Sequence, residues 1–100
     1  MTQAIAKDTH AEGHSTVASD HAAHAEGYET VASGWGSHSE GLGTEASGHG
    51  SHAEGGTYTD ENNIIHKTVA SNDGSHAEGL GTTSSSKGSH SEGEFTTASG

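Results

Sequence analysis

Histidine and glutamate, whose side chains bind protons and metal ions, recur in this chain as the motif His-x-Glu. The motif occurs six times, with histidines His10, His24, His38, His52, His76 and His90 and glutamates Glu12, Glu26, Glu40, Glu54, Glu78 and Glu92. Residues two apart lie on the same face of a strand, so the two residue types are predicted to form neighbouring columns. Imidazole donates hydrogen bonds to carboxylate, and both groups ligate zinc, nickel or copper. The columns therefore predict a hydrogen-bonded surface or a metal site.

The same motif gives little support to catalysis. Ser37 and His38 are adjacent, so in a strand their side chains point to opposite faces and cannot form a nucleophile–base pair. Zinc deaminases also contain His-x-Glu, but they need cysteine ligands and a Pro-Cys motif, and this chain has neither cysteine nor proline. A catalytic residue is also expected once rather than six times. We therefore expect no enzymatic activity and no required cofactor.

Composition limits the fold and the partners. Only 26% of the 100 residues are hydrophobic, too few for a conventional core of large aliphatic side chains. Fourteen acidic residues against three basic ones give a net charge of -11, which repels nucleic-acid phosphates and anionic membranes. No signal peptide is expected in residues 1–8, and no stretch has the length and apolarity of a membrane span. We expect neither nucleic-acid binding nor membrane insertion.

The pentapeptide Ser-His-Ala-Glu-Gly and its variants return every fourteen residues. Copies begin at positions 9, 23, 37, 51, 75 and 89, and the one longer gap equals one unit plus ten inserted residues. Each unit divides into two similar sevens, as in Ser-His-Ser-Glu-Gly-Leu-Gly and Thr-Glu-Ala-Ser-Gly-His-Gly over 37–50. A helical heptad would need large apolar residues where these units have Ala, Ser, Thr and Gly. The period instead predicts short strands separated by glycine turns.

Alternation along each strand puts small residues on one face and His and Glu on the other. A coil of two short strands has room only for small side chains, so the small face is predicted to point inward. Threonines at 16, 30, 44, 68, 82 and 96 share that face, which makes an ice-binding threonine surface a poor interpretation. Glycines at 13, 27, 41, 55, 79 and 93 are predicted to adopt positive φ where the chain reverses. The two inward columns are Ala11, Ala25, Ser39, Ala53, Ala77 and Ser91, and Ala18, Ala32, Ala46, Ala70, Ser84 and Ala98.

The predicted fold is thus all-β, a parallel β-roll or solenoid of 14-residue coils with two short strands per coil. We predict a lead-in over residues 1–8 and six repeats over residues 9–100, with an insertion at 56–67. So narrow a roll buries little apolar surface, and we expect identical copies to associate. The His and Glu columns are favoured as the seam between copies. The alternatives are a solvated outer ladder, or a metal ion held adventitiously or on the axis of the assembly.

The insertion is the only non-repetitive surface of the sequence. Asn62-Asn63 is predicted to turn a small hairpin in which Tyr58 pairs with Ile64 and Ile65. Because other large apolar groups are scarce, we favour a hairpin that packs these three side chains onto a neighbouring protomer. The alternative is a contact with a ligand or receptor.

The repeat Ser-His-Ala-Glu-Gly-x-x-Thr-x-Ala-Ser-Gly-x-Gly resembles the head repeat of trimeric autotransporter adhesins (YadA-like head repeats). That family alternates Ser-Val-Ala-Ile-Gly with an x-x-Ala-x-Gly seven, and the resemblance covers residues 9–100. It implies a left-handed parallel β-roll in which three chains pack around an axis. The family's Val and Ile positions are His and Glu here, so a seam at these positions would be polar.

Similar repeats occur in phage tail fibres, where the roll is a shaft or spacer. The family's export signal, coiled-coil stalk and membrane anchor are not seen in these residues, so the resemblance favours a phage or prophage fibre over an autotransporter. It implies a homotrimeric structural segment of a fibre or adhesin on a virion or cell surface. The alternative is an adhesin head that binds a host-surface receptor or glycan through residues 56–67.

Overall fold

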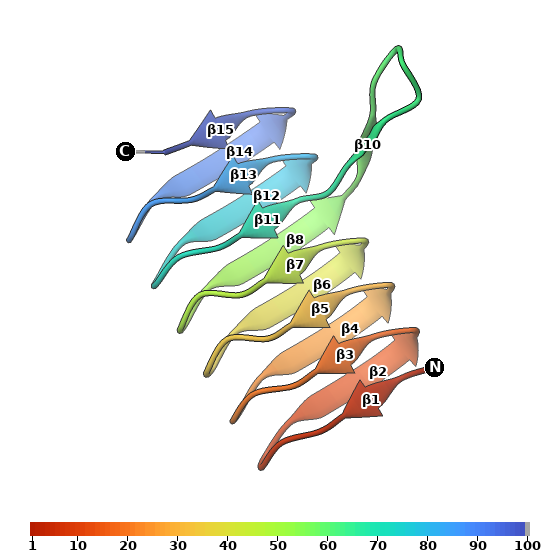
Figure 1. Cartoon of the computed structure of the whole chain (residues 1–100), viewed down its shortest axis with the longest axis vertical. Helices are drawn as coiled ribbons and strands as arrows, with labels where there is room; N and C mark the ends of the chain where they lie inside the picture. Colours follow the sequence, from red (N-terminus) through yellow and green to blue (C-terminus); the bar gives the residue numbers. More distant parts are fainter. Residues whose placement is uncertain (100) are drawn as a thin grey trace.

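The computed structural model describes residues 1–99 as a parallel β-solenoid of about seven coils, without a helix (Figure 1). Each full coil contains one five-residue strand and one two-residue strand, which confirms the predicted all-β roll with two short strands per coil. The long strands are β2 (His10–His14), β4 (His24–Tyr28), β6 (His38–Leu42), β8 (His52–Gly56), β12 (His76–Leu80) and β14 (His90–Glu94). The short strands are β1 (Gln3–Ala4), β3 (Val17–Ala18), β5 (Val31–Ala32), β7 (Glu45–Ala46), β11 (Val69–Ala70), β13 (Thr83–Ser84) and β15 (Thr97–Ala98).

Each kind of strand forms its own parallel sheet, and the fourteen-residue period sets the register of both. His24 pairs with His38 and Val31 with Glu45, so equivalent positions of successive coils lie above one another. Across the insertion, His52 pairs with His76, and the register is kept. The molecule measures 38 × 28 × 15 Å. Within residues 1–99, no helix has the length and apolarity needed to cross a membrane.

Residues 1–8, which we expected to be a lead-in, contribute β1 to the short-strand sheet. Gln3 pairs with Val17 and Ala4 with Ala18, so the winding starts one half-coil before the first His-x-Glu motif. A two-residue strand carries so little pattern that the sequence of this segment did not indicate it.

The core consists of the small residues that the period placed inside. Ala18, Ala25, Ala32, Ala46, Ala53, Ala70 and Ala77 are fully buried, and Thr16, Thr30, Thr44, Thr68 and Thr82 are the largest fully buried side chains. The buried hydroxyls bond locally: the Thr44 hydroxyl donates to the Glu40 carbonyl at 3.0 Å and lies 2.7 Å from the Ser39 hydroxyl. Only the end coils differ, since Ala11 and Ala98 are half-buried and Thr96 is exposed. The prediction that the threonines face inward is confirmed for every covered coil.

A column of glycines runs along the long-strand sheet, near the C-terminal end of each strand. Each is the fourth residue of its strand, with φ between +108° and +116°, so the predicted positive φ is confirmed. The chain does not reverse at these glycines, however; it turns two residues later, for example at Glu29 and Gly43, whose φ values are 56° and 64°. A Cβ added to Gly55 would lie 2.0 Å from the carbonyl oxygen of Gly79. The glycines are therefore required because adjacent coils approach closely.

The insertion forms the predicted hairpin, with antiparallel strands β9 (Tyr58–Thr59) and β10 (Ile65–His66). Asn63 lies in the turn with a φ of 63°. Tyr58 pairs with His66 and Thr59 with Ile65, so the expected pairing of Tyr58 with Ile64 and Ile65 is wrong. Ile64 belongs to the turn because its N–H bonds to the Asp60 carboxylate at 3.0 Å. The hairpin projects from the rod and rises towards the C-terminal end (Figure 1).

Candidate functional site on the His/Glu face

The six His-x-Glu histidines form one continuous stack along the long-strand sheet. Successive ring centroids are 4.5 to 4.7 Å apart. The rings are nearly parallel from His24 to His90, whereas His10 is tilted by 47° to His24. The stack follows from the fold, because in-register parallel strands about 4.8 Å apart repeat the same side chain in every layer.

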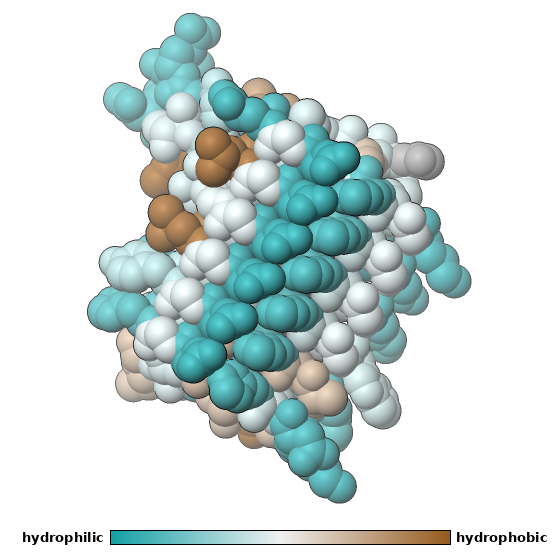
Figure 2. Space-filling view, turned by 180° about the vertical axis from the view of Figure 1, so that it is seen from behind, coloured by the Kyte–Doolittle hydropathy of each residue, from teal (hydrophilic) through white to brown (hydrophobic). Residues whose placement is uncertain are grey.

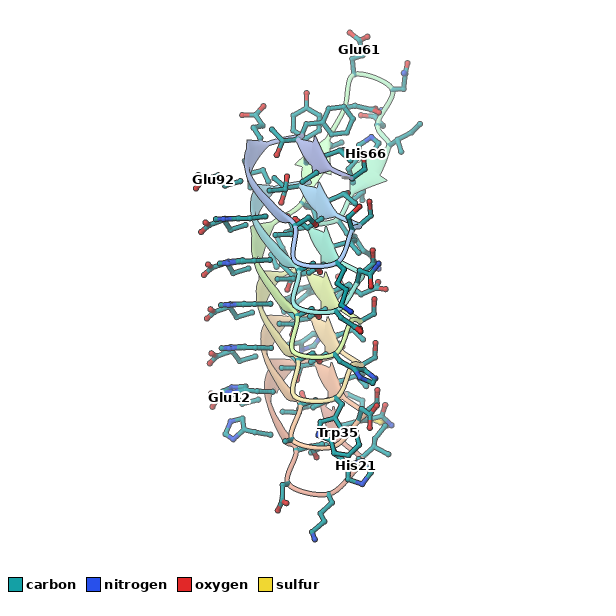
Figure 3. All side chains as sticks on the ribbon, turned by 90° about the vertical axis from the view of Figure 1, so that its left-hand side faces the viewer. Glu12, His21, Trp35, Glu61, His66 and Glu92 are labelled. Carbon is teal, nitrogen blue, oxygen red and sulfur yellow. The ribbon has the colours of Figure 1, made fainter. Side chains whose placement is uncertain are left out.

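The glutamates form the second column and interleave with the histidines. Nε2 of a histidine donates to Oε1 of the glutamate in the preceding coil, at 3.3 Å for His52 and Glu40 and at 3.0 Å for His90 and Glu78. His76 makes the same contact with Glu54 at 3.3 Å. In Figure 3, the labelled Glu12 and Glu92 lie on the same side of the roll. The structure thus brings together all twelve side chains that the sequence placed on one face.

The N-terminal part of the ladder is looser than the rest. Glu26 Oε1 lies 3.7 Å from His24 Nε2 and 3.6 Å from His38 Nε2, beyond hydrogen-bonding distance. The Nε2 atoms of His24 and His38 are shielded from solvent and have no hydrogen-bond partner among residues 1–99. Two imidazoles therefore keep an unused ring nitrogen.

The His/Glu face is negatively charged because its six glutamate carboxylates lie in one column. Figure 2 shows the columns as adjacent hydrophilic rows running the length of the rod. The pKa of Glu78 is lowered, chiefly because His90 donates a hydrogen bond to its carboxylate. In the middle coils the side chains remain about one-third exposed, for instance 35% for His38 and 34% for Glu40. The face is ordered, acidic and accessible.

The hairpin is a second candidate site. Its conformation is stabilised by the Asp60 carboxylate and by an aromatic cluster. The Asp60 carboxylate accepts hydrogen bonds from His66 Nε2 at 2.9 Å, from the Asn62 N–H at 2.8 Å and from the Ile64 N–H at 3.0 Å. These bonds, the His66 one foremost, lower the pKa of Asp60.

Phe95 ties the hairpin to the last coil. Its ring stacks on Tyr58 with centroids 4.9 Å apart and meets His66 at 4.5 Å. Gly81 lies beneath, where an added Cβ would be 2.6 Å from the Tyr58 Cβ. The sequence indicated no contact between Phe95 and the insertion, because these residues are far apart in the chain and Phe95 occupies a variable turn position of its repeat.

A hollow of about 330 Å³ lies beside the hairpin, lined by Glu29, Leu42, Gly43, Thr57, Ile65 and Lys67. Of the three predicted contact residues, only Ile65 reaches it. Tyr58 packs in the aromatic cluster, and Ile64 is exposed in the turn. The three residues therefore do not line one hollow, and nothing in the sequence indicated that Leu42 and Lys67 would border Ile65.

A third cluster occupies the turns that lead into the long strands. Trp35 is 58% exposed and lies between His21 and His49, with ring centroids 5.3 and 6.5 Å away. Figure 3 shows His21 and Trp35 side by side. The pKa of the neighbouring Asp20 is lowered, chiefly by the backbone N–H of His21. These two histidines lie outside the His/Glu columns and provide a natural comparison for them.

Comparisons with protein-family models, curated proteins and solved structures find no match to this chain. The class of this protein is therefore described from its fold and its surface residues alone. It is a parallel β-solenoid that carries an ordered His/Glu ladder on its long-strand sheet and a hairpin on one edge.

Proposed function

We propose that this chain is a structural, non-enzymatic segment of a fibre or adhesin, a left-handed homotrimeric β-roll that serves as shaft or head on a virion or cell surface. The observation that supports this most is the unbroken parallel pairing of the six long strands. The register persists across a ten-residue insertion, so the rod keeps its regularity while carrying a projecting element. A phage tail fibre needs such a stiff spacer.

Association of three chains is supported by the small amount of apolar surface that a single chain buries. Among residues 1–99, no fully buried side chain is larger than threonine, so hydrophobic burial within one roll is small. Small domains of this kind commonly gain stability by oligomerisation. A continuous face that repeats the same residues in every coil suits a symmetric interface.

The His/Glu ladder is the proposed seam. Each imidazole has a second nitrogen and each carboxylate a second oxygen, so bonds within one chain leave capacity for bonds to another. About one-third of each side chain is still open in the middle coils, and a partner chain would cover that surface. A polar seam of this kind selects the register between chains more strongly than an apolar one, because a shifted register leaves buried polar atoms unpaired.

Sedimentation equilibrium tests this proposal with two double variants. We expect the wild type to have the mass of three 10.0-kDa chains. His38→Ala with His52→Ala removes two central imidazoles and is expected to shift the mass towards one chain. His21→Ala with His49→Ala, outside the ladder, should leave the trimer intact. A wild type that sediments as a single chain at micromolar concentration refutes the trimer, whereas an unaffected His38/His52 variant refutes only the location of the seam.

A second candidate function is receptor or glycan binding by the hairpin. It is favoured by the hollow in which exposed Ile65 and Leu42 adjoin the opposite charges of Glu29 and Lys67. Deleting residues 57–66 and replacing Lys67 by glycine would leave a two-residue turn like those of the other coils. Glycan-array and cell-binding assays of this variant should show lost binding with an unchanged oligomer mass. Equal binding by the deletion variant and the wild type would exclude this candidate.

A further inference from the structure

We propose that His24, Glu26 and His38 form a binding site for a divalent transition-metal ion of the zinc or nickel class. The site lies within one chain, between β4 and β6, and needs no partner chain. It therefore goes beyond the structural role proposed above. Its three ligands also belong to the proposed seam, and metal affinity tests the site whereas oligomer mass tests the seam.

The distances suit one ion held by three ligands. Zinc binds imidazole nitrogen and carboxylate oxygen at about 2.0 to 2.2 Å, so two ligand atoms of a tetrahedral ion lie about 3.4 Å apart. Glu26 Oε1 is 3.7 Å from His24 Nε2 and 3.6 Å from His38 Nε2, within a few tenths of an ångström of that separation. All three ligand atoms lie within 4.8 Å of one another. The His24 and His38 rings are stacked with their centroids 4.5 Å apart and their planes 12° from parallel, so both rings must rotate towards each other to direct their Nε2 lone pairs at one ion.

The free ring nitrogens single out this triad within the ladder. Nε2 of His24 and Nε2 of His38 are shielded from solvent and unpartnered among the described residues. In the coils above, His52, His76 and His90 already donate to a glutamate at 3.0 to 3.3 Å. A shielded polar atom without a partner is unfavourable, and a bound cation would satisfy both nitrogens together. An ion here displaces no existing hydrogen bond, whereas an ion higher in the stack must break one.

Charge and ligand type decide the class of ion. No lysine forms an ion pair with the glutamate column in residues 1–99, so its stacked carboxylates lack a fixed counter-charge. Two imidazoles and one carboxylate are typical ligands of zinc, nickel and copper, whereas magnesium and calcium prefer oxygen alone. Three protein ligands leave one position for water.

The ladder also limits how many ions one chain can hold. His/Glu/His triads repeat between every pair of successive long strands, and neighbouring triads share a histidine. Because one Nε2 lone pair binds one ion, an ion at His24 and His38 leaves one further pair among His52, His76 and His90, so a chain with this site filled holds at most two ions. The triad of His24, Glu26 and His38 is expected to fill first.

The test uses the full chain with Zn²⁺ and Co²⁺ as probes. Zn²⁺ titration by calorimetry should give micromolar binding, and Co²⁺ should give the visible absorption of a tetrahedral ion. Substoichiometric Co²⁺ should broaden the imidazole NMR signals of His24 and His38 before those of His21 and His49. Equal broadening of all four signals, or no Zn²⁺ binding below millimolar concentration, overturns the proposal.

Variants then assign the ligands. His24→Gln with His38→Gln should weaken the tightest binding step at least tenfold. The matched control, His21→Gln with His49→Gln, removes as many histidines and should change it less than twofold. Should the first variant lose its β-sheet circular dichroism, Glu26→Gln, which keeps the side-chain shape, replaces it with the same expected weakening. Equal losses in test and control variants would mean adventitious binding to surface histidines and would overturn the site.

Discussion

Glycine occurs in this roll both within the long strands, where adjacent coils approach closely, and in open turns. Substitution by alanine, which adds one methyl group, should distinguish these two positions. Gly55 is the fourth residue of β8 with a φ of +116°, and Gly50 lies in a turn with a φ of +65°. Both residues have positive φ, but only Gly55 is enclosed: its added Cβ would be 2.0 Å from the Gly79 carbonyl oxygen, whereas nothing lies within 4 Å of a Cβ at Gly50. We therefore compare Gly55→Ala with Gly50→Ala.

The expected magnitudes differ because the strain differs. At Gly50, alanine pays about 1 kcal/mol for the left-handed conformation, partly offset by a less flexible unfolded chain. Ala22 already occupies the equivalent turn position with a φ of 57°. At Gly55, a φ that essentially only glycine adopts costs about 1–3 kcal/mol. The Gly79 carbonyl must also retreat by about 1 Å, which weakens at least two ladder hydrogen bonds worth about 1 kcal/mol each. We expect Gly55→Ala to destabilise the roll by at least about 3 kcal/mol.

Thermal unfolding followed by circular dichroism measures this difference at one protein concentration. A loss of about 3 kcal/mol corresponds to a fall in Tm of at least about 12 °C for a domain of this size, and Gly50→Ala should lower the Tm by less than about 6 °C. If Gly55→Ala melts within a few degrees of Gly50→Ala, the coils do not approach as closely as described, and the steric explanation of the glycine column is wrong.

The remaining predictions concern the core and the hairpin. Ala53→Val should cost about 1–3 kcal/mol in urea unfolding, because the fully buried site has no room for two more methyl groups; an unchanged midpoint would contradict the narrow core. Ser39→Ala should change stability by less than about 0.5 kcal/mol, because other coils carry alanine at this position; a larger loss would show that the Ser39 hydroxyl is needed. The pKa of Asp60 is lowered in the folded hairpin, so its ionised carboxylate stabilises the hairpin above about pH 3.8. This stabilisation should disappear as the pH falls through the lowered pKa that Asp60 has in the folded state. The protection of the Ile64 amide against hydrogen exchange, measured relative to the intrinsic rate at each pH, should then fall in the wild type but not in Asp60→Asn. Phe95→Ala should remove the ring stacked on Tyr58 and speed amide exchange in β9 and β10 without lowering protection in β4 and β6, and equal rates would mean that the hairpin is held by other contacts.

The His/Glu ladder combines two properties that proteins usually keep apart. Its carboxylates and imidazoles are regular enough to pair with an identical face, and its looser N-terminal part leaves ring nitrogens free for a cation. The proposed seam and metal site use the same columns but need different variants to test them. His38 and Glu26 belong to both sets, so oligomer mass is the readout for the seam and Zn²⁺ affinity is the readout for the metal site.

The repeat by itself determined most of the fold. A seven-residue alternation of small and polar residues, broken by glycine, admits only a thin coil with Ala25, Ala53 and Thr44 inside and His and Glu outside, because side chains alternate strictly along a strand. For the same reason the sequence was enough to place the twelve His and Glu side chains on one face. It also indicated a hairpin at the insertion, from its length and its Asn62-Asn63 turn.

The tertiary structure decided what depends on contacts between coils. Only the stacking distance and the rotamers determine that Glu40 bonds to His52 rather than to His38, and that Glu26 bonds to neither neighbour. The tilt of the hairpin onto Phe95 joins residues about thirty apart in the chain, and the repeat carries no information about it. A period specifies which residues share a face, because that is a local property of the backbone. It does not specify how closely their side chains meet, because that depends on the packing of the whole roll.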